Sequence, residues 1–312
     1  MTYLSMGEGG ARPHVSELVI NWHLTEACNY KCQYCYAKWN SNDKELIHDW
    51  DRTRKMLDEL MRFFQPSNDA NPLQKSMRWS GVRLNLAGGE PLLYPDAVLR
   101  VLAYAKAAGM NTSIITNGSR FTPELMIQLA PQVSMLGISI DSAKTATNEE
   151  IGRIDSQGRM KSWQEVAALM QQAKQLNPEL AIKINTVVNA LNAHEDLSEP
   201  IAALAPDRWK VFRMLPVVTD DLAVSPEEFA SFVQRHHRHA DVMCAEDNNE
   251  MSESYLMIDP LGRFFQNTKG QKGYNYSRPI DTVGAKQAFR DWRFAVTSFT
   301  SRYPAPAIEA IQ

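Results

Sequence analysis

The cysteines are the residues whose spacing most directly suggests chemistry. Three of the four lie within eight residues, at Cys28, Cys32 and Cys35, with the spacing C-x₃-C-x₂-C. Three thiols on one loop can bind three irons of a [4Fe–4S] cluster, whereas structural zinc sites and standard clusters usually take four protein ligands. The fourth iron is then open to a substrate or cofactor. A zinc ion completed by His23 or His48, or three unremarkable thiols, would give the same spacing.

Two short segments after expected strands form a second group of candidates. Gly88 and Gly89, in Ala-Gly-Gly-Glu-Pro, allow close approach of the backbone. The carboxylate of Glu90, at a strand end, can pair with an ammonium group. Asn117 lies in Thr-Asn-Gly after the next expected strand. A plain turn explains each segment when it is considered alone.

Hydrophobic periodicity predicts the elements that must position these residues. Strands are expected at 19–24, 82–87, 111–116, 134–141, 180–188 and 209–215, followed by a hairpin of 255–258 and 263–265. Helices are expected at 50–64 and 95–108, after the caps at 122, 162 and 225, and between 188 and 209. Six strand–helix units argue for a parallel α/β fold, but fall short of a closed eight-fold barrel.

Several of these strands have one polar face. Lys183 and Asn185 alternate with isoleucines, and Arg83 and Asn85 alternate with leucines. A fully buried parallel sheet is apolar on both faces. We therefore predict a partial barrel whose lumen is a polar ligand cavity and whose outer face is covered by helices. The alternative, a half-exposed antiparallel sheet, fits the intervening helices badly.

Composition excludes several other classes of protein. The chain has 312 residues, a net charge of −3 and a pI of about 6.2, which argues against a general nucleic-acid binder. It has no run of about 18 apolar residues that could span a membrane. Its N-terminus lacks the basic patch and apolar stretch of a secretory signal. We expect a cytoplasmic protein with no membrane partner and no direct nucleic-acid partner.

Together the motifs resemble the radical S-adenosylmethionine (SAM) superfamily, which places C-x₃-C-x₂-C after the first strand of a partial (βα)₆ barrel and Gly-Gly-Glu after the second. The chain is similar in particular to prokaryotic members of the viperin family. That similarity covers about residues 16–290 and includes Cys-Asn-Tyr-Lys-Cys at 28–32, Lys-Ile-Asn at 183–185 and Ser-Tyr-Leu-Met-Ile-Asp at 254–259. It implies a flexible N-terminus (1–15), a radical SAM barrel (16–215) and a C-terminal extension (216–312) that completes a nucleotide site.

The resemblance implies two cofactors, a [4Fe–4S] cluster on the three cysteines and SAM. One-electron reduction of SAM would release a 5′-deoxyadenosyl radical, which the cavity must shield from water. The positions that contact SAM in the family are occupied here by Gly88, Gly89, Glu90, Asn117, Ser139 and Arg153. The expected electron donor is a reductase, flavodoxin or ferredoxin.

The resemblance also implies a nucleoside triphosphate substrate: CTP, UTP or GTP. Removal of the 4′ hydrogen and loss of water would give a 3′-deoxy-3′,4′-didehydro nucleotide, a chain terminator of viral RNA synthesis in antiviral defence. The expected substrate-binding residues are Lys183, Asn185, Arg208 and Lys210. A buried lysine needs a counter-charge, which a phosphate chain or a buried carboxylate can supply. Tyr255 matches a tyrosine suited to donate hydrogen to a sugar radical, with aromatic packing as the alternative.

Two other functions compete with this interpretation. One is a radical SAM enzyme that modifies a peptide or RNA. Many peptide-modifying members carry extra clusters, yet Cys244 is the only cysteine after Cys35. The other is a non-catalytic iron–sulfur interaction protein, in which Lys183 and Tyr255 would have little purpose.

Some residues give weaker signals. Cys244 is expected to be a free, buried thiol, and His23 a satisfied core histidine. His236, His237 and His239 are expected on a solvated helix face. Lys269 and Lys272 are expected in a mobile basic turn, and residues 273–312 are expected to act as a lid over the site.

Overall fold

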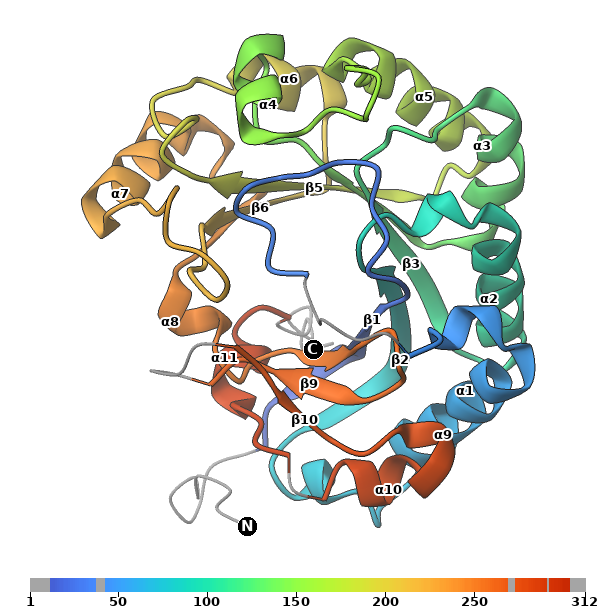
Figure 1. The fold of residues 1–312 in the computed structure, drawn as a ribbon. Helices are drawn as coiled ribbons and strands as arrows, with labels where there is room; N and C mark the ends of the chain where they lie inside the picture. Colours follow the sequence, from blue (N-terminus) through green and yellow to red (C-terminus); the bar gives the residue numbers. More distant parts are fainter. Residues whose placement is uncertain (1–11, 38–42, 269–272, 291, 304–312) are drawn as a thin grey trace, which may run out of the picture.

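The computed structural model describes residues 12–37, 43–268, 273–290 and 292–303. Within these residues one sheet of ten strands curves into an open barrel (Figure 1). The strand order is β10-β9-β8-β1-β2-β3-β4-β5-β6-β7. Lys269 and Lys272 lie outside the described residues.

Seven strands in parallel register form most of the barrel wall. They are β1 (His14–His23), β2 (Arg78–Ala87), β3 (Asn111–Thr116), β4 (Met135–Ser139), β5 (Ala181–Val188), β6 (Arg208–Arg213) and β7 (Met243–Glu246). Each pairs with the next along the chain. Their carboxyl ends therefore meet at one edge of the barrel, where the connecting loops can build a site.

Helices cover the outside of this wall (Figure 1). They are α1 (Trp50–Phe64), α2 (Pro95–Ala107), α3 (Pro123–Leu129), α4 (Thr145–Ile151), α5 (Trp163–Leu176), α6 (Ser198–Leu204) and α7 (Pro226–Arg235). In α1 the buried residues Met56, Leu60 and Phe63 recur at helical spacing and face the sheet side. Ser162 and Ser225 form complete capping boxes at α5 and α7.

The last part of the chain extends the sheet at both edges. Strand β7 lies at one edge, while β8 (Leu256–Ile258) pairs in parallel with β1 at the other. Strands β9 (Phe264–Gln266) and β10 (Asn275–Tyr276) follow in antiparallel register. In the described residues after β7 there are four short α-helices: α8 (Asn248–Met251), α9 (Ile280–Val283), α10 (Ala285–Ala288) and α11 (Val296–Thr300). The sheet thus crosses the boundary expected between residues 215 and 216.

The partial barrel with a C-terminal extension is confirmed, and the helix at 50–64 and the strand at 111–116 have the predicted bounds. The first strand begins at His14, inside the segment expected to be flexible, rather than at residue 19. Strand β7 was not predicted, because four residues show no useful alternation. Among the described residues, no helix is both long enough and apolar enough to cross a bilayer.

Candidate active site

A cavity lies at the carboxyl ends of the strands and is covered in part by the loop after β1, drawn in dark blue in Figure 1. It brings together most of the residues that the sequence singled out. Those lining it are Cys28, Cys32, Cys35, Gly88, Gly89, Asn117, Ser139, Arg153, Lys183, Asn185, Lys210 and Tyr255. Glu90 and Arg208 are not among the lining residues.

The two glycines after β2 dock the cysteine loop against the barrel. Gly89 N donates to Thr25 O (2.7 Å), and Glu90 N donates to Ala27 O (2.8 Å). A Cβ atom on Gly89 would lie 2.1 Å from Ala27 O, and Gly88 has φ +135°, which side chains rarely adopt. The Gly-Gly-Glu backbone therefore fixes the position of the loop that carries the cysteines.

The far end of the cysteine loop is held by the turn after α4. Lys31 N donates to Gly152 O (2.9 Å), and Gln33 N donates to Ile151 O (3.0 Å). Gly152 has φ +91°, and a Cβ there would lie 2.4 Å from Lys31 O. The loop is thus clamped on both sides, which holds the three cysteines in a defined arrangement.

Burial makes the cysteines weak acids in the absence of a cation. It raises the pKa of Cys28 to about 11 and that of Cys32 to about 12. Metal ions invert this effect because they favour the thiolate. In the described part of the chain, no three His, Cys, Asp or Glu side chains are grouped to hold one metal ion. Cys28, Cys32 and Cys35 all line the cavity, which suits a cluster whose open iron faces a ligand.

The Glu90 carboxylate ties β2 to β3 instead of facing the cavity. It is fully buried and accepts hydrogen bonds from Leu92 N (2.9 Å), Thr116 Oγ1 (2.7 Å) and Asn117 N (2.7 Å). The carboxylate is therefore not placed for the expected pairing with an ammonium group of SAM. Its effect is indirect, since it holds Asn117, whose Nδ2 lies 4.0 Å from Cys28 Sγ.

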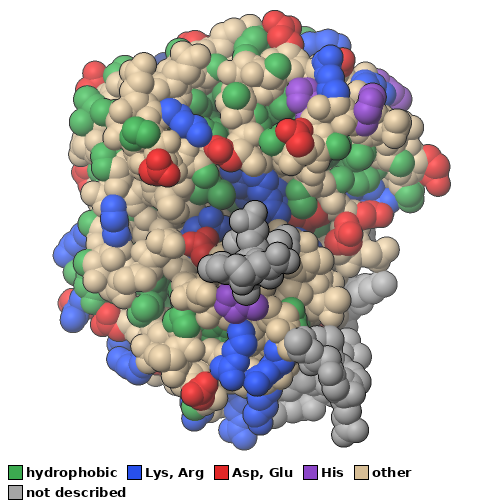
Figure 2. Space-filling model, turned by 180° about the vertical axis from the view of Figure 1, so that it is seen from behind, with side chains coloured by type: hydrophobic (Ala, Val, Ile, Leu, Met, Phe, Trp, Pro, Cys, Tyr) green, Lys and Arg blue, Asp and Glu red, His purple; other side chains and the backbone are tan. Residues whose placement is uncertain are grey.

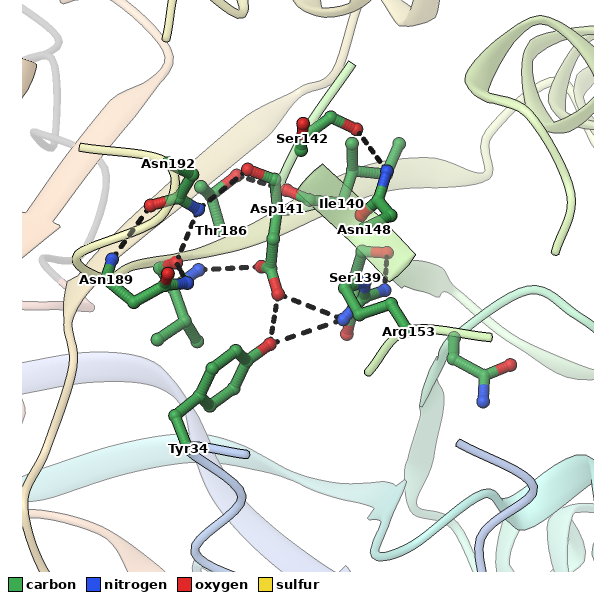
Figure 3. Close-up of polar contacts among 12 residues, drawn as sticks. Tyr34, Ser139, Ile140, Asp141, Ser142, Asn148, Arg153, Thr186, Asn189 and Asn192 are labelled. Carbon is green, nitrogen blue, oxygen red and sulfur yellow. Dashed lines mark hydrogen bonds and ion pairs between the residues drawn. The ribbon is translucent and has the colours of Figure 1, made fainter. Parts of the chain in front are cut away.

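Arg153 lies on the cavity wall within a buried polar network (Figure 3). Its Nη1 forms an ion pair with Asp141 Oδ2 (3.1 Å), and its Nη2 donates to Ser139 O (2.6 Å). The hydroxyl of Tyr34, between two of the cysteines, donates to the same Asp141 oxygen. No motif in the sequence indicated the role of Asp141 or that of Tyr34.

Lys183 is the cation with the least compensation in the cavity. Among the described residues it makes no hydrogen bond and no ion pair. Burial, followed by the charges of Lys210, Arg83 and Arg208, lowers its pKa well below the usual value. Figure 2 shows a recessed group of Lys and Arg side chains near the centre of the rear face. An anionic ligand would relieve this concentration of positive charge.

Tyr255 belongs to a second buried network, centred on Glu246. Its hydroxyl donates to Glu246 and accepts from Lys210 Nζ (2.9 Å). Glu246 also pairs with Lys210 and with Arg302 Nε (2.9 Å). Burial and then Glu246 raise the pKa of the Tyr255 phenol well above its usual range. Lys210 thus forms a buried ion pair with Glu246, which is the buried-carboxylate alternative considered from the sequence, although Lys210 also lines the cavity.

Arg208 contacts the end of the chain rather than the cavity. Its Nη2 donates to Arg302 O (2.7 Å) and lies 3.6 Å from Cys244 Sγ, and its guanidinium lies 5.1 Å from the ring centre of Tyr303. Tyr303 itself lines the cavity. Arg208 is therefore not placed to make the expected contact with a substrate in the cavity. Cys244 is a free thiol, as predicted, but it is partly rather than fully buried.

Amide groups extend the polar lumen across neighbouring strands. Asn85 Nδ2 donates to Asn21 Oδ1 (2.9 Å), and Ser113 Oγ donates to Asn85 Oδ1 (2.7 Å). Asn185 lines the cavity, and its buried Oδ1 has no hydrogen-bond partner within the described part of the chain. A buried oxygen without a partner costs free energy, so a ligand donor there would be favourable.

The histidines differ in part from expectation. His23 is buried, packs edge-on against Phe265 at 5.1 Å, and has its pKa lowered by burial to about 3. The prediction of a solvated face was wrong for His236, which is fully buried beside Trp209. Its Nε2 accepts from Leu197 N (2.8 Å), so it joins α7 to α6.

Comparison with known proteins decides the family. The profile of the radical SAM superfamily matches residues 22–189. An S-adenosylmethionine-dependent nucleotide dehydratase of Psychrobacter lutiphocae is 42% identical over 92% of this chain and 95% of its own length. A protein of the same name from Pseudoalteromonas ulvae is 42% identical over 93% and 94%. The chain is a radical SAM enzyme of the nucleotide dehydratase family.

The radical SAM fold is also evident from solved structures. A structure described as native anSMEcpe with bound AdoMet and Kp18Cys peptide superimposes with a TM-score of 0.66, covering 91% of this chain and 84% of that chain at 14% identity. Enzymes of this superfamily use a [4Fe–4S] cluster and SAM, and the three cysteines of the clamped loop suit the cluster.

Proposed function

We propose that the chain converts a nucleoside triphosphate into its 3′-deoxy-3′,4′-didehydro analogue, by removal of the 4′ hydrogen and loss of water. The observation that carries this proposal is a single cavity lined by the three cysteines, Arg153, the uncompensated Lys183 and Tyr255. The names of the relatives support the same activity. The product is a chain terminator suited to antiviral defence.

The cysteine side of the cavity would hold the cofactors. Cys28, Cys32 and Cys35 would ligate the cluster, and Arg153 would bind the carboxylate of SAM. When bound and reduced by one electron, the cluster and SAM supply a hydrogen-abstracting radical. The electrons come from a separate donor, for which we propose a reductase, a flavodoxin or a ferredoxin.

The opposite wall would hold the triphosphate. Lys183 can pair with a phosphate oxygen without breaking another contact, because it has no partner among the described residues. Lys210 already pairs with Glu246, so it would share its charge between that carboxylate and the ligand. Asn185 Oδ1, which has no partner among the described residues, can accept from a hydroxyl of the ribose. Tyr255 and Tyr303, both after residue 215, complete this wall.

Tyr255 would supply one electron and one proton in the final step. The electron reduces the sugar radical as the 3′ hydroxyl leaves, and the proton joins that hydroxyl to give water, so that a C3′–C4′ double bond forms. A phenol whose hydroxyl proton is hydrogen-bonded to a carboxylate has a nearby base. Lys210, which donates to the same phenolic oxygen, orients the ring toward the cavity. The phenol would then be restored by an electron and a proton from the donor system.

The test is an anaerobic reaction of the reconstituted enzyme with dithionite, SAM and one nucleoside triphosphate at a time. We expect one triphosphate to yield a product lighter by one water, detected by mass spectrometry, together with 5′-deoxyadenosine. Formation of 5′-deoxyadenosine with no triphosphate consumed would contradict the proposal. Consumption of an added peptide instead would favour a peptide-modifying enzyme.

A further inference from the structure

Asp141, two residues beyond the end of β4, connects three parts of the site through one buried carboxylate (Figure 3). It is 1% exposed, and both of its carboxylate oxygens are used. Oδ2 accepts from Arg153 Nη1 and from the hydroxyl of Tyr34, while Oδ1 accepts from Val187 N (2.9 Å). The cysteine loop, the turn after α4 and the end of β5 therefore meet at this side chain.

The contacts fix the plane of the Arg153 guanidinium. Asp141 holds one terminal nitrogen, and Ser139 O holds the other at 2.6 Å. Guanidinium has five N–H donors in a rigid fork. Two anchored nitrogens leave the remaining donors in a defined direction, on a side chain that lines the cavity.

The Asp141 carboxylate also fixes the position of the last residues of β5. Val187 lies on the cavity face of this strand, two residues after Asn185 and four after Lys183. Asn192 Nδ2 donates to the main-chain oxygen of Asp141 (2.8 Å) and to Val187 O (2.9 Å), which reinforces the junction. The distance between the cysteine loop and β5, the strand expected to contact the nucleotide, thus depends on Asp141.

We propose that Asp141 is a positioning residue that orients Arg153 for the carboxylate of SAM and holds the cysteine loop in place against β5. This inference rests on the proposed function, because it takes Arg153 as a SAM-binding residue. The Glu90 carboxylate, by contrast, makes no contact with Arg153 and ties β2 to β3.

Removal of the charge of Asp141 has two opposite effects on the binding of an anionic ligand. It leaves Arg153 without its buried counter-charge, which by itself would strengthen attraction to a carboxylate. It also releases the guanidinium from its fixed plane. If Asp141 acts by positioning, the second effect dominates and SAM binds more weakly.

The first test is Asp141→Asn in the reconstituted holoenzyme, with SAM affinity measured by equilibrium dialysis. Asn keeps the Oδ1 acceptor for Val187 N, so the strand contact survives. We expect the Kd for SAM to rise roughly 10- to 100-fold, as when an outer partner of a ligand-binding side chain is lost, with iron content unchanged. The matched control is Asp155→Asn, which removes an ion pair with exposed Arg159 (2.9 Å) and leaves the Kd unchanged. Tighter or equal binding by Asp141→Asn would overturn the inference.

A double-mutant cycle separates positioning from general damage. In an Arg153→Gln background, Asp141→Asn should cause no further loss of SAM affinity, because its effect passes through Arg153. Additive losses would overturn the inference while the proposed function stands. If Asp141→Asn does not fold, Arg153→Lys keeps the charge but cannot span Asp141 and Ser139 O, and it must also weaken SAM binding. A wild-type holoenzyme without SAM affinity would contradict the proposed function and the inference together.

Discussion

At the scale of single residues, two buried carboxylates organise the cavity by the same chemistry. Asp141 accepts from a phenol and pairs with Arg153, and Glu246 accepts from the Tyr255 phenol and pairs with Arg302. Neither carboxylate is exposed. Groups that face a ligand are thus held by buried carboxylates, which lowers the cost of ordering them on binding.

Lys183 gives the first residue-scale prediction. Lys183→Met keeps the length of the side chain but removes the cation, and we expect triphosphate affinity to fall about 10- to 100-fold, the usual range for one hydrogen bond to a charged group. The absorbance of the iron–sulfur cluster should not change. The control is Lys174→Met, which removes an exposed ion pair with Asp207. Loss of the cluster signal in Lys183→Met would show a structural role instead.

Tyr255 gives the second prediction about a single residue. Tyr255→Phe removes only the hydroxyl, so we expect SAM cleavage to continue while the didehydro product falls by at least about 100-fold, the lower end of the range for a lost proton-transfer group. The ratio of 5′-deoxyadenosine to product, measured by mass spectrometry, should therefore rise. Tyr276→Phe changes an exposed tyrosine on β10 and serves as the control. An unchanged ratio would assign Tyr255 to packing.

At the scale of elements, the barrel positions the cysteine loop through backbone contacts that only glycine permits. We expect Gly89→Ala to displace the loop, since the new Cβ would lie 2.1 Å from Ala27 O. Iron content after reconstitution should fall strongly, while far-ultraviolet circular dichroism stays that of a folded protein. Gly81→Ala, earlier on β2 with its nearest contact at 3.7 Å, is the matched control. Full iron content in Gly89→Ala would refute the clamp.

The contact between α6 and α7 predicts a pH dependence of stability. Burial lowers the pKa of His236 below its usual value of about 6.5, despite Asp196 at 3.5 Å. The unfolded chain then binds a proton more readily than the folded one. The free energy of unfolding should fall as the pH drops below about 6.5, by up to about 1.4 kcal/mol per pH unit from this group.

Urea unfolding of the wild type and of His236→Asn across pH 5–7.5 tests this prediction. The variant is expected to be less stable at pH 7.5 but to have a shallower pH dependence. His237→Asn, at an exposed neighbour, should keep the wild-type slope. Parallel curves for the wild type and His236→Asn would mean that His236 does not titrate differently in the two states.

At the scale of the whole molecule, the sequence predicted the barrel and most of the cavity because both depend on local patterns. Alternation along β5 indicated a polar lumen, and the motifs after β1 and β2 indicated the cluster loop. Lys183 and Asn185 do lie on the cavity wall.

Partners distant along the chain were not predictable in this way. Glu246 is on a strand of four residues, and Asp141 is the last residue of an expected strand, where no motif marks it. Only the fold brings them to Tyr255 and Arg153. The same limit explains why Glu90 and Arg208 carry suitable chemistry yet contact protein groups rather than the cavity.

The most direct test of the whole account is the fate of the 4′ hydrogen. The reduced holoenzyme would be given SAM and the accepted nucleoside triphosphate carrying deuterium at C4′, and 5′-deoxyadenosine would be analysed by mass spectrometry. We predict one deuterium in 5′-deoxyadenosine and its absence from the didehydro product. Unlabelled 5′-deoxyadenosine formed alongside product would contradict 4′-hydrogen abstraction and, with it, the assignment of the cavity.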